Sequence, residues 1–270
     1  MADLVSTTAP VAALAFVRKM LAVAEMEVRK LRHDPMELVS RAVQPALWLL
    51  IFGQVMAHAR AIDTGGVPYL DYLVPGILGQ SVLFIAIFNG ISIIWERDLG
   101  IVHKFLVSPA PRAALVLGKA LGGGMRALVQ AVVVVVLGTL LGVRMRYDPA
   151  SLAGVVVFVV LGAAVFSSFS LFIACIVKTR ERFMGVGQVL TMPLFFASNA
   201  IYPTALMPSW LRAIARVNPL TYQIDALREL LLPAHGALAP LGLATDFGVL
   251  AIALALMVTA AARIYPHIAT

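Results

Sequence analysis

The sequence has little charge and almost no cysteine for its length. Of 270 residues, 13% are charged and a single one, Cys175, is a cysteine, whereas a soluble domain carries about 25% charged residues. One cysteine excludes a disulfide within the chain and a cysteine-based metal site. The low charge, together with 61% hydrophobic residues and a mean hydropathy of +0.93, predicts an integral membrane protein.

The sequence also lacks the motifs of several enzyme classes. Gly118-Lys119 is followed by Ala120, and no glycine stands five residues before Gly118, so the phosphate-cradling loop of ATPases is missing. The five histidines are scattered without metal-ligand spacing: His33, His58, His103, His235 and His267. No Ser/His/Asp or paired-carboxylate arrangement is apparent. We therefore expect no catalytic residue, cofactor or metal on this chain.

Long apolar runs dominate what is present. A membrane crossing needs about 20 residues, and these runs are continuous rather than alternating, which favours helices over strands. We expect an all-α integral membrane protein with six transmembrane helices. Their predicted bounds are about 38–56, 73–95, 111–142, 152–177, 183–202 and 241–262.

The segment 11–32 is too charged to cross a membrane. Apolar residues recur every three or four positions from Leu14 to Leu31, while Arg18 and Glu25 lie on the other side. This pattern predicts an amphipathic helix in the membrane interface, and a soluble helix packed on a partner is the alternative. The expected organisation is a tail and interfacial helix at 1–35, followed by a transmembrane domain at 36–270.

A short charged excursion at 96–109 separates the predicted second and third spans. Three consecutive charges begin at Glu96, directly after an uncharged run, so the chain is expected to leave the lipid there. Ile101, Phe105 and Ser108 then share one helical face. The excursion reads as a short amphipathic helix with an apolar edge for a partner, and a plain solvated connector is the alternative.

The distribution of Lys and Arg predicts the orientation. One side of the membrane would hold Arg18, Lys19, Arg29, Lys30, Arg32, Arg97, Lys104, Arg112, Lys178, Arg180, Arg182 and Arg263, and the other Arg60, Arg144, Arg146, Arg212, Arg216 and Arg228. The first set is larger, so we expect that side, both termini and the charged excursion to be cytoplasmic. The net charge of +7 is then explained by orientation and anionic lipid rather than by nucleic acid.

The external segment 203–240 is expected to be helical. Ser209 to Val217 has amphipathic spacing, and Asn218-Pro219 is typical of a helix start, with an N-cap followed by proline at the first position. Asp225 and Arg228 are spaced to pair on this helix. It is too short and charged to cross, so we expect re-entrant half-helices in the outer leaflet, or alternatively a surface cap.

Two stretches resemble ABC-2 type transporter permeases. Glu96-Arg97-Asp98-Leu99-Gly100, Phe105-Leu106-Val107-Ser108-Pro109 and Leu117-Gly118-Lys119 are similar to the family's first cytoplasmic loop. Trp210-Leu211, Asn218-Pro219-Leu220-Thr221-Tyr222 and Asp225-Ala226-Leu227-Arg228 are similar to its signature before the last span. The resemblance covers nearly the whole chain and is nearest to the drug- and lipid-exporting branch. The family's Thr and Glu are replaced here by Ile101 and His103.

The resemblance implies an interfacial elbow helix and a coupling helix that docks on a separate ATPase subunit. The expected coupling residues are Glu96, Arg97, Asp98, Gly100, His103, Lys104, Phe105 and Leu106. The expected external gate residues are Asn218, Pro219, Tyr222, Asp225 and Arg228. Two permeases, identical or related, would pair with two ATPase subunits, which would carry ATP and Mg.

Few ionisable residues lie within the spans, so coupling to protons or sodium is not expected. The main hypothesis is the permease subunit of an ATP-driven exporter of a drug, lipid or glycolipid in a bacterial cell membrane. The alternatives are a non-transport scaffold or sensor with the same fold, and a membrane-embedded lipid-modifying enzyme, which would need a cluster of acids or histidines at one membrane face.

Overall fold

The computed structural model describes residues 9–31, 42–100, 111–177, 179–233 and 239–265. Every regular element in these ranges is helical, as predicted. The elements are α1 (Ala9–Leu31), a helical stretch Ala42–Ala59 that contains the π-helical η1 (Trp48–Gly53) and α3 (Gln54–Ala59), α4 (Tyr69–Phe88), α5 (Ile91–Asp98), α7 (Arg112–Leu140), α8 (Pro149–Ile176), α9 (Arg180–Phe196), η2 (Thr204–Leu206), α10 (Ser209–Val217), α11 (Pro219–Leu231) and α12 (Leu243–Ile264).

Five helical stretches are long and apolar enough to cross a membrane, so the chain is a multi-pass membrane protein. They are Ala42–Ala59, Tyr69–Asp98, Arg112–Leu140, Pro149–Ile176 and Leu243–Ile264. The predicted span at 183–202 corresponds to α9, which has 17 residues and ends at Phe196, a length of about 26 Å. Asn218 explains this early end, because its amide donates to the Leu194 and Ala197 carbonyls at the end of α9.

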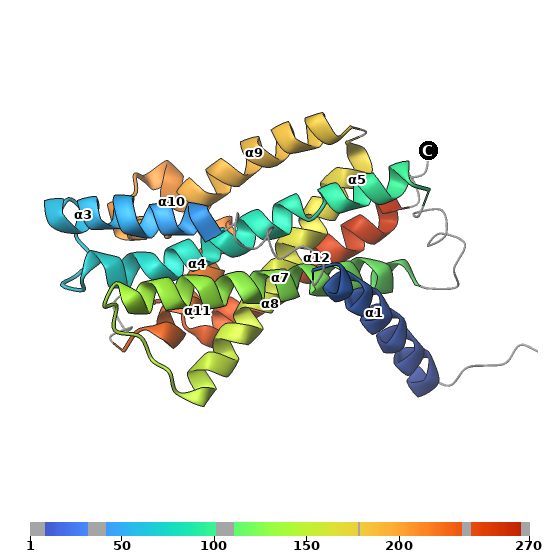
Figure 1. Ribbon diagram of the computed structural model, residues 1–270, viewed down its shortest axis with the longest axis horizontal. Helices are drawn as coiled ribbons and strands as arrows, with labels where there is room; N and C mark the ends of the chain where they lie inside the picture. The colour runs from blue at the N-terminus through green and yellow to red at the C-terminus, as the bar shows by residue number, and fades with distance from the viewer. Residues whose placement is uncertain (1–8, 32–41, 101–110, 178, 234–238, 266–270) are drawn as a thin grey trace, which may run out of the picture.

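Most of the longer helices run roughly along the long axis of the molecule in alternating directions, whereas α1 lies at a steep angle to it (Figure 1). α4, α7 and α8 pack on one another at the centre, with α12 along α8. A continuous apolar core fills the space between them and includes Leu73, Ile77, Val134 and Val159, all fully buried. α10 and α11 lie at one end of the molecule, whereas α1 and the end of α5 lie at the other.

The second span differs from its predicted bounds at both ends. It begins at Tyr69, in a stretch expected to be a loop, because the Tyr69 and Tyr72 hydroxyls donate to the Ile201 and Asn199 carbonyls and are buried there. The helical stretch continues through Glu96 to Asp98. Glu96 is 5% exposed and pairs with Lys119, so its charge faces protein, and the exit from the lipid at this residue stays a prediction.

The N-terminal amphipathic helix is present as α1, and its place in the membrane interface stays a prediction. Val17 and Leu21 of its apolar side are exposed, whereas Val23, Ala24 and Glu27 are buried against α7. The contact is close because α7 presents glycines to α1: a Cβ at Gly118 would come within 2.6 Å of the Val23 Cβ. The division at residue 35 stays a prediction, since 32–41 lie outside the described residues.

Candidate functional site

Four buried charges gather at the end of the molecule that holds α1 and α5. Lys119 Nζ lies 2.5 Å from Glu96 Oε2 and 3.5 Å from Glu27 Oε1. Arg126 lies 3.2 Å from Glu27 Oε2 and donates to Asn89 Oδ1 at 2.5 Å. Three of the side chains are at most 6% exposed, and that of Arg126 is 11% exposed. Among these four described side chains, two acids and two bases balance, which lowers the cost of burying them. We call these residues the α1–α5–α7 network.

Lys119 and Arg126 lie in the first half of α7, a long apolar helix. Charges at such positions are compatible with a helix that projects from the membrane or with side chains that face protein. Both charges face protein, seven residues apart and therefore on one side of α7. Glu27 was not among the predicted site residues, although an acid on the elbow helix was the available signal.

The predicted coupling residues separate into two groups. Glu96 points into the network, while Arg97 and Asp98 are part-exposed and pair with each other at 3.4 Å. Asp98 also accepts from Arg180 of α9 at 2.7 Å, and the Arg180 guanidinium lies 3.4 Å from the centre of the Trp95 ring. These contacts tie the end of α5 to the start of α9.

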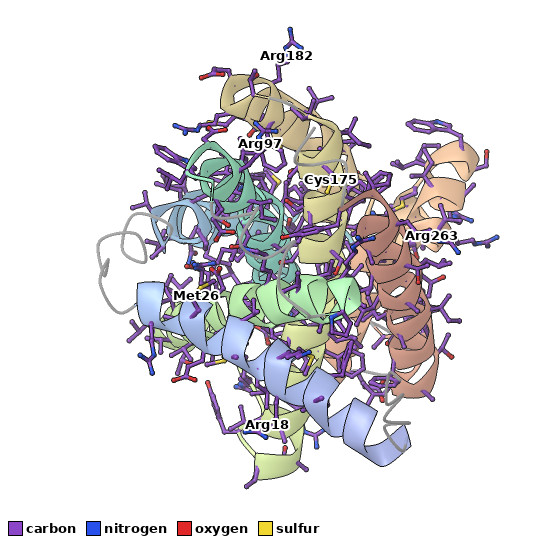
Figure 2. All side chains as sticks on the ribbon, turned by 90° about the vertical axis from the view of Figure 1, so that its right-hand side faces the viewer. Arg18, Met26, Arg97, Cys175, Arg182 and Arg263 are labelled. Carbon is purple, nitrogen blue, oxygen red and sulfur yellow. The ribbon has the colours of Figure 1, made fainter. Side chains whose placement is uncertain are left out.

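Gly100 follows the end of α5 with a φ of +70°, the left-handed conformation that glycine adopts after a helix. The remaining coupling residues, His103, Lys104, Phe105 and Leu106, lie outside the described residues. Figure 2 looks onto this end and shows Arg18, Arg97, Arg182 and Arg263 on four different helices. The helix directions thus place these four arginines, which the loop counts assigned to one side, at the same end of the molecule (Figure 2).

At the opposite end, Asn218 and Pro219 begin α11 as predicted. Asn218 Oδ1 accepts from the Leu220 N–H at 3.0 Å, and Pro219 occupies the first helical position. The Asn218 amide also reaches the carbonyls at the end of α9, so one side chain joins two helix termini. Tyr222, on the first turn of α11, donates from its hydroxyl to the Arg216 carbonyl of α10 at 2.6 Å.

Arg228 is almost completely buried at this end and has no carboxylate partner in its contacts. Its guanidinium donates to the Asn199 carbonyl at 2.5 Å and to the Tyr72 and Ala200 carbonyls at 3.4 Å. It also lies 3.8 Å from the centre of the Tyr72 ring. The predicted ion pair with Asp225 is therefore wrong, because the carbonyls at the turn after α9 attract the guanidinium instead. We call Arg228 and these partners the Arg228 site.

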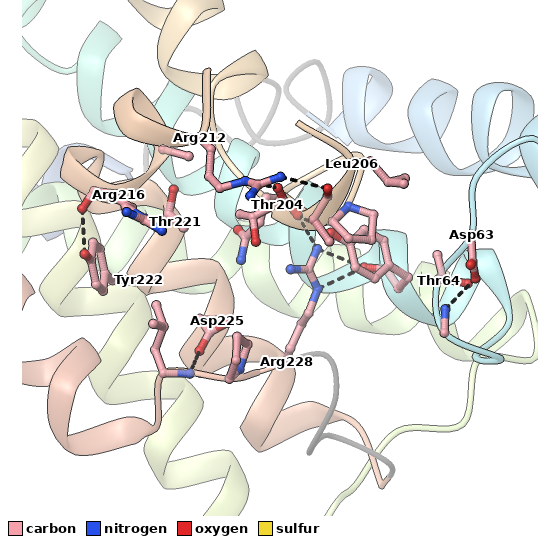
Figure 3. A pocket seen from close by; sticks show the side chains of 18 residues that line it. Asp63, Thr64, Thr204, Leu206, Arg212, Arg216, Thr221, Tyr222, Asp225 and Arg228 are labelled. Carbon is pink, nitrogen blue, oxygen red and sulfur yellow. Dashed lines mark hydrogen bonds between the residues drawn. The ribbon is translucent and has the colours of Figure 1, made fainter. Parts of the chain in front are cut away.

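Asp225 accepts from the Leu241 N–H at 3.2 Å instead. Burial raises the pKa of Asp225 to about 6, against the opposing effects of that hydrogen bond and of Arg228. Both residues line a cavity of about 550 Å³ that also contacts Asp63, Arg212 and Tyr222 (Figure 3). The predicted gate residues Tyr222, Asp225 and Arg228 thus share one cavity wall, while Asn218 and Pro219 set the position of their helix.

A second cavity, of about 610 Å³, lies beside the middle of the Tyr69–Asp98 stretch, and we call it the mid-level cavity. It is lined by side chains from four helical segments, among them Gln44, Gln80, Gln130 and Gln188, with Phe84, Phe88, Met184 and Met192. Gln80 is 2% exposed, and its amide nitrogen has no hydrogen-bond partner among the described residues. Amides are rare at this level of a membrane protein unless they face protein or a ligand. No sequence motif points to this cavity, because its glutamines are distant from one another in the sequence.

The sequence matches the family model of the ABC-2 type transporter over residues 18–232, so the chain belongs to this family. It is 30% identical over 206 residues to the daunorubicin resistance ABC transporter permease protein DrrB1 of Streptomyces coeruleorubidus, covering 76% of this chain and 71% of the relative. It is 29% identical to the putative transport permease ycf38 of Cyanophora paradoxa, covering 80% and 74%. It is 26% identical to the inner membrane transport permease YadH of Escherichia coli K12, covering 80% and 81%.

Proposed function

We propose that this chain is the permease subunit of an ATP-driven exporter that moves a hydrophobic or amphipathic molecule out of the cytoplasm or the inner leaflet. The observation that carries the proposal is the mid-level cavity. Its amides can bind polar groups, and its phenylalanines and methionines can pack on an apolar body. A drug, a lipid or a glycolipid combines both properties, and the DrrB1 relative is named for resistance to a drug.

In this proposal ATP and Mg bind a separate ATPase subunit, present in two copies, and a second permease completes the pathway. Arg97, Asp98 and Gly100 lead into the docking segment that holds His103, Lys104, Phe105 and Leu106. α9 completes six spans, α10 and α11 form re-entrant half-helices at the outer end, and both termini lie in the cytoplasm. Asn218, Pro219, Tyr222, Asp225 and Arg228 close the pathway outside.

Transport by inverted membrane vesicles tests the proposal. With the permease and its ATPase subunit co-expressed, ATP should drive uptake of daunorubicin or of a fluorescent phospholipid, measured by fluorescence. Gln80→Leu should lower this uptake at least about tenfold while ATPase co-purification persists, because one buried hydrogen-bonding group discriminates strongly. The matched control is Gln54→Leu, which changes an exposed glutamine of α3.

The docking assignment is tested on the same complex. Phe105→Ala should abolish co-purification of the ATPase subunit while membrane insertion is kept. Co-purification at the unmodified level would refute the coupling segment, and vesicles without ATP-dependent uptake of either probe would refute export of this class of molecule.

A further inference from the structure

Glu27 contacts two cations of α7, Lys119 and Arg126, and thereby connects three helices. Its two carboxylate oxygens lie 3.5 Å from Lys119 Nζ and 3.2 Å from Arg126. Lys119 in turn holds Glu96 at the end of α5, and Arg126 holds Asn89 at the junction of α4 and α5. One acid on α1 is thus linked, through Lys119 and Arg126, to both sides of the junction between α4 and α5.

The shape of α7 matches this contact. Gly122 lies between Lys119 and Arg126, and a Cβ there would overlap the Glu27 side chain. A Cβ at Gly124 would instead meet Val160 at an ordinary 3.4 Å. A glycine is therefore required at 122 for α1 to reach its position, whereas the side of α7 that faces α8 has room for a methyl group.

Separating the three helices would break buried ion pairs. If α5 moved away from α7, buried Lys119 would lose its 2.5 Å contact with Glu96, and Glu27 beside it also contacts Arg126. Uncompensated buried charge is strongly unfavourable, so α1, α7 and the end of α5 are held together more firmly than apolar packing alone would hold them. The end of α5 lies three residues before the segment 101–110.

We propose that Glu27 is a positioning residue that locks α1 and α7 to the end of α5, so that a displacement of segment 101–110 moves the three helices as one unit. This inference rests on the proposed function in one respect, the docking of that segment on an ATPase. The linkage of α1 and α7 to the end of α5 through Glu27, which we call the lock, is a property of this chain alone.

The double variant Glu27→Gln/Arg126→Gln tests the lock. It removes one charge of each sign, leaves Lys119 paired with Glu96, and touches none of the proposed coupling residues. Hydrogen exchange of the full chain in detergent should show faster exchange of α1 amides, at least about fivefold, with α8 unchanged. The matched control is Glu25→Gln/Arg29→Gln, which removes an exposed pair on the same helix.

The second variant changes no charge and keeps the lock testable if the double variant does not fold. Gly122→Ala should displace α1 and accelerate its exchange as the double variant does, whereas Gly124→Ala should leave it unchanged. Unchanged α1 exchange in either Glu27→Gln/Arg126→Gln or Gly122→Ala would overturn the lock.

The second arm measures transmission in the complex with the ATPase subunit. Ala205 is exposed and lines the cavity of about 550 Å³ that also contains Asp225 and Arg228. It is replaced by cysteine in a Cys175→Ser background, and an impermeant maleimide labels this cysteine with and without ATP. The ATP-dependent change in labelling rate should fall at least about fivefold in Gly122→Ala but not in Gly124→Ala.

The two arms separate the possible failures. An ATP response retained in Gly122→Ala, despite faster α1 exchange, would overturn the positioning role. An unmodified complex without any ATP response would refute the proposed function and the transmission step with it. The exchange arm would still decide whether Glu27 holds α1.

Discussion

The two ends of the molecule bury positive charge in opposite ways. In the α1–α5–α7 network, Lys119 and Arg126 are balanced by the carboxylates of Glu27 and Glu96. In the Arg228 site, the guanidinium is held by three backbone carbonyls and a tyrosine ring. Carboxylates can be removed by mutation together with their cations, but carbonyls cannot. In the network an acid and a base can therefore be removed together with no change in net charge. In the Arg228 site, removal of the arginine always takes the donor from the buried carbonyls.

The largest effect is expected at the Arg228 site. Arg228→Met should lower the free energy of unfolding by about 4 kcal/mol, because the buried carbonyls of Tyr72, Asn199 and Ala200 lose their donor. The measurement is denaturation of the purified protein in detergent. A loss below about 1 kcal/mol would show that water replaces the guanidinium.

Arg212→Met is the matched control for this variant. Arg212 also donates to three carbonyls, those of Thr204, Ala205 and Met207, but it is only half-buried. Water can satisfy the same carbonyls there, so the expected loss is about 1 kcal/mol. Equal losses in the two variants would mean that burial does not distinguish the two arginines.

The next effect concerns the network and should be reversible in a pair. Lys119→Met alone should cost about 3 kcal/mol, because it removes the cation that lies 2.5 Å from the buried carboxylate of Glu96. Adding Glu96→Gln should restore most of that stability in the same denaturation assay. No recovery in the double variant would contradict the view that charge balance, rather than these particular side chains, stabilises this end.

The smallest effect concerns the junction of α9 and α11. Asn218→Ala should cost about 2 kcal/mol, through loss of the cap on α11 and of two donors to α9. Asn218→Asp separates these contributions, because it keeps the capping oxygen and removes the donors. We expect the melting temperature of Asn218→Asp to lie between those of Asn218→Ala and the unmodified chain. A melting temperature equal to that of the unmodified chain would exclude the bridge to α9.

Much of the architecture could be predicted from the sequence because apolar runs and caps are local signals. The third span, predicted at 111–142, is α7 at Arg112–Leu140, and the start of α11 follows from Asn218-Pro219. The bounds that differ are set by distant partners. Lys119 pairs with Glu96, which lies in a helix that continues to Asp98, and Asn218 accounts for the end of α9 at Phe196.

The candidate sites show the same difference between local sequence signals and partners that are distant in sequence. The family resemblance selected the stretch after Trp95 and the stretch after Asn218, since each is continuous in sequence. Glu27 and the glutamines of the mid-level cavity were missed, because their neighbours come from other helices. Asp225 and Arg228 have the spacing of a helical ion pair, yet each has a stronger partner elsewhere in the fold.

By itself, the sequence determined that this protein lies in a membrane, is helical and has basic residues concentrated at one end of its helices, since hydropathy and helix capping depend on neighbouring residues alone. Only the tertiary structure decided where its few buried charges go. A buried charge takes whichever partner the packing brings within about 3 Å. Here packing places α1 on α7 at Gly118 and Gly122, and it places Arg228 beside the carbonyls of the turn after α9.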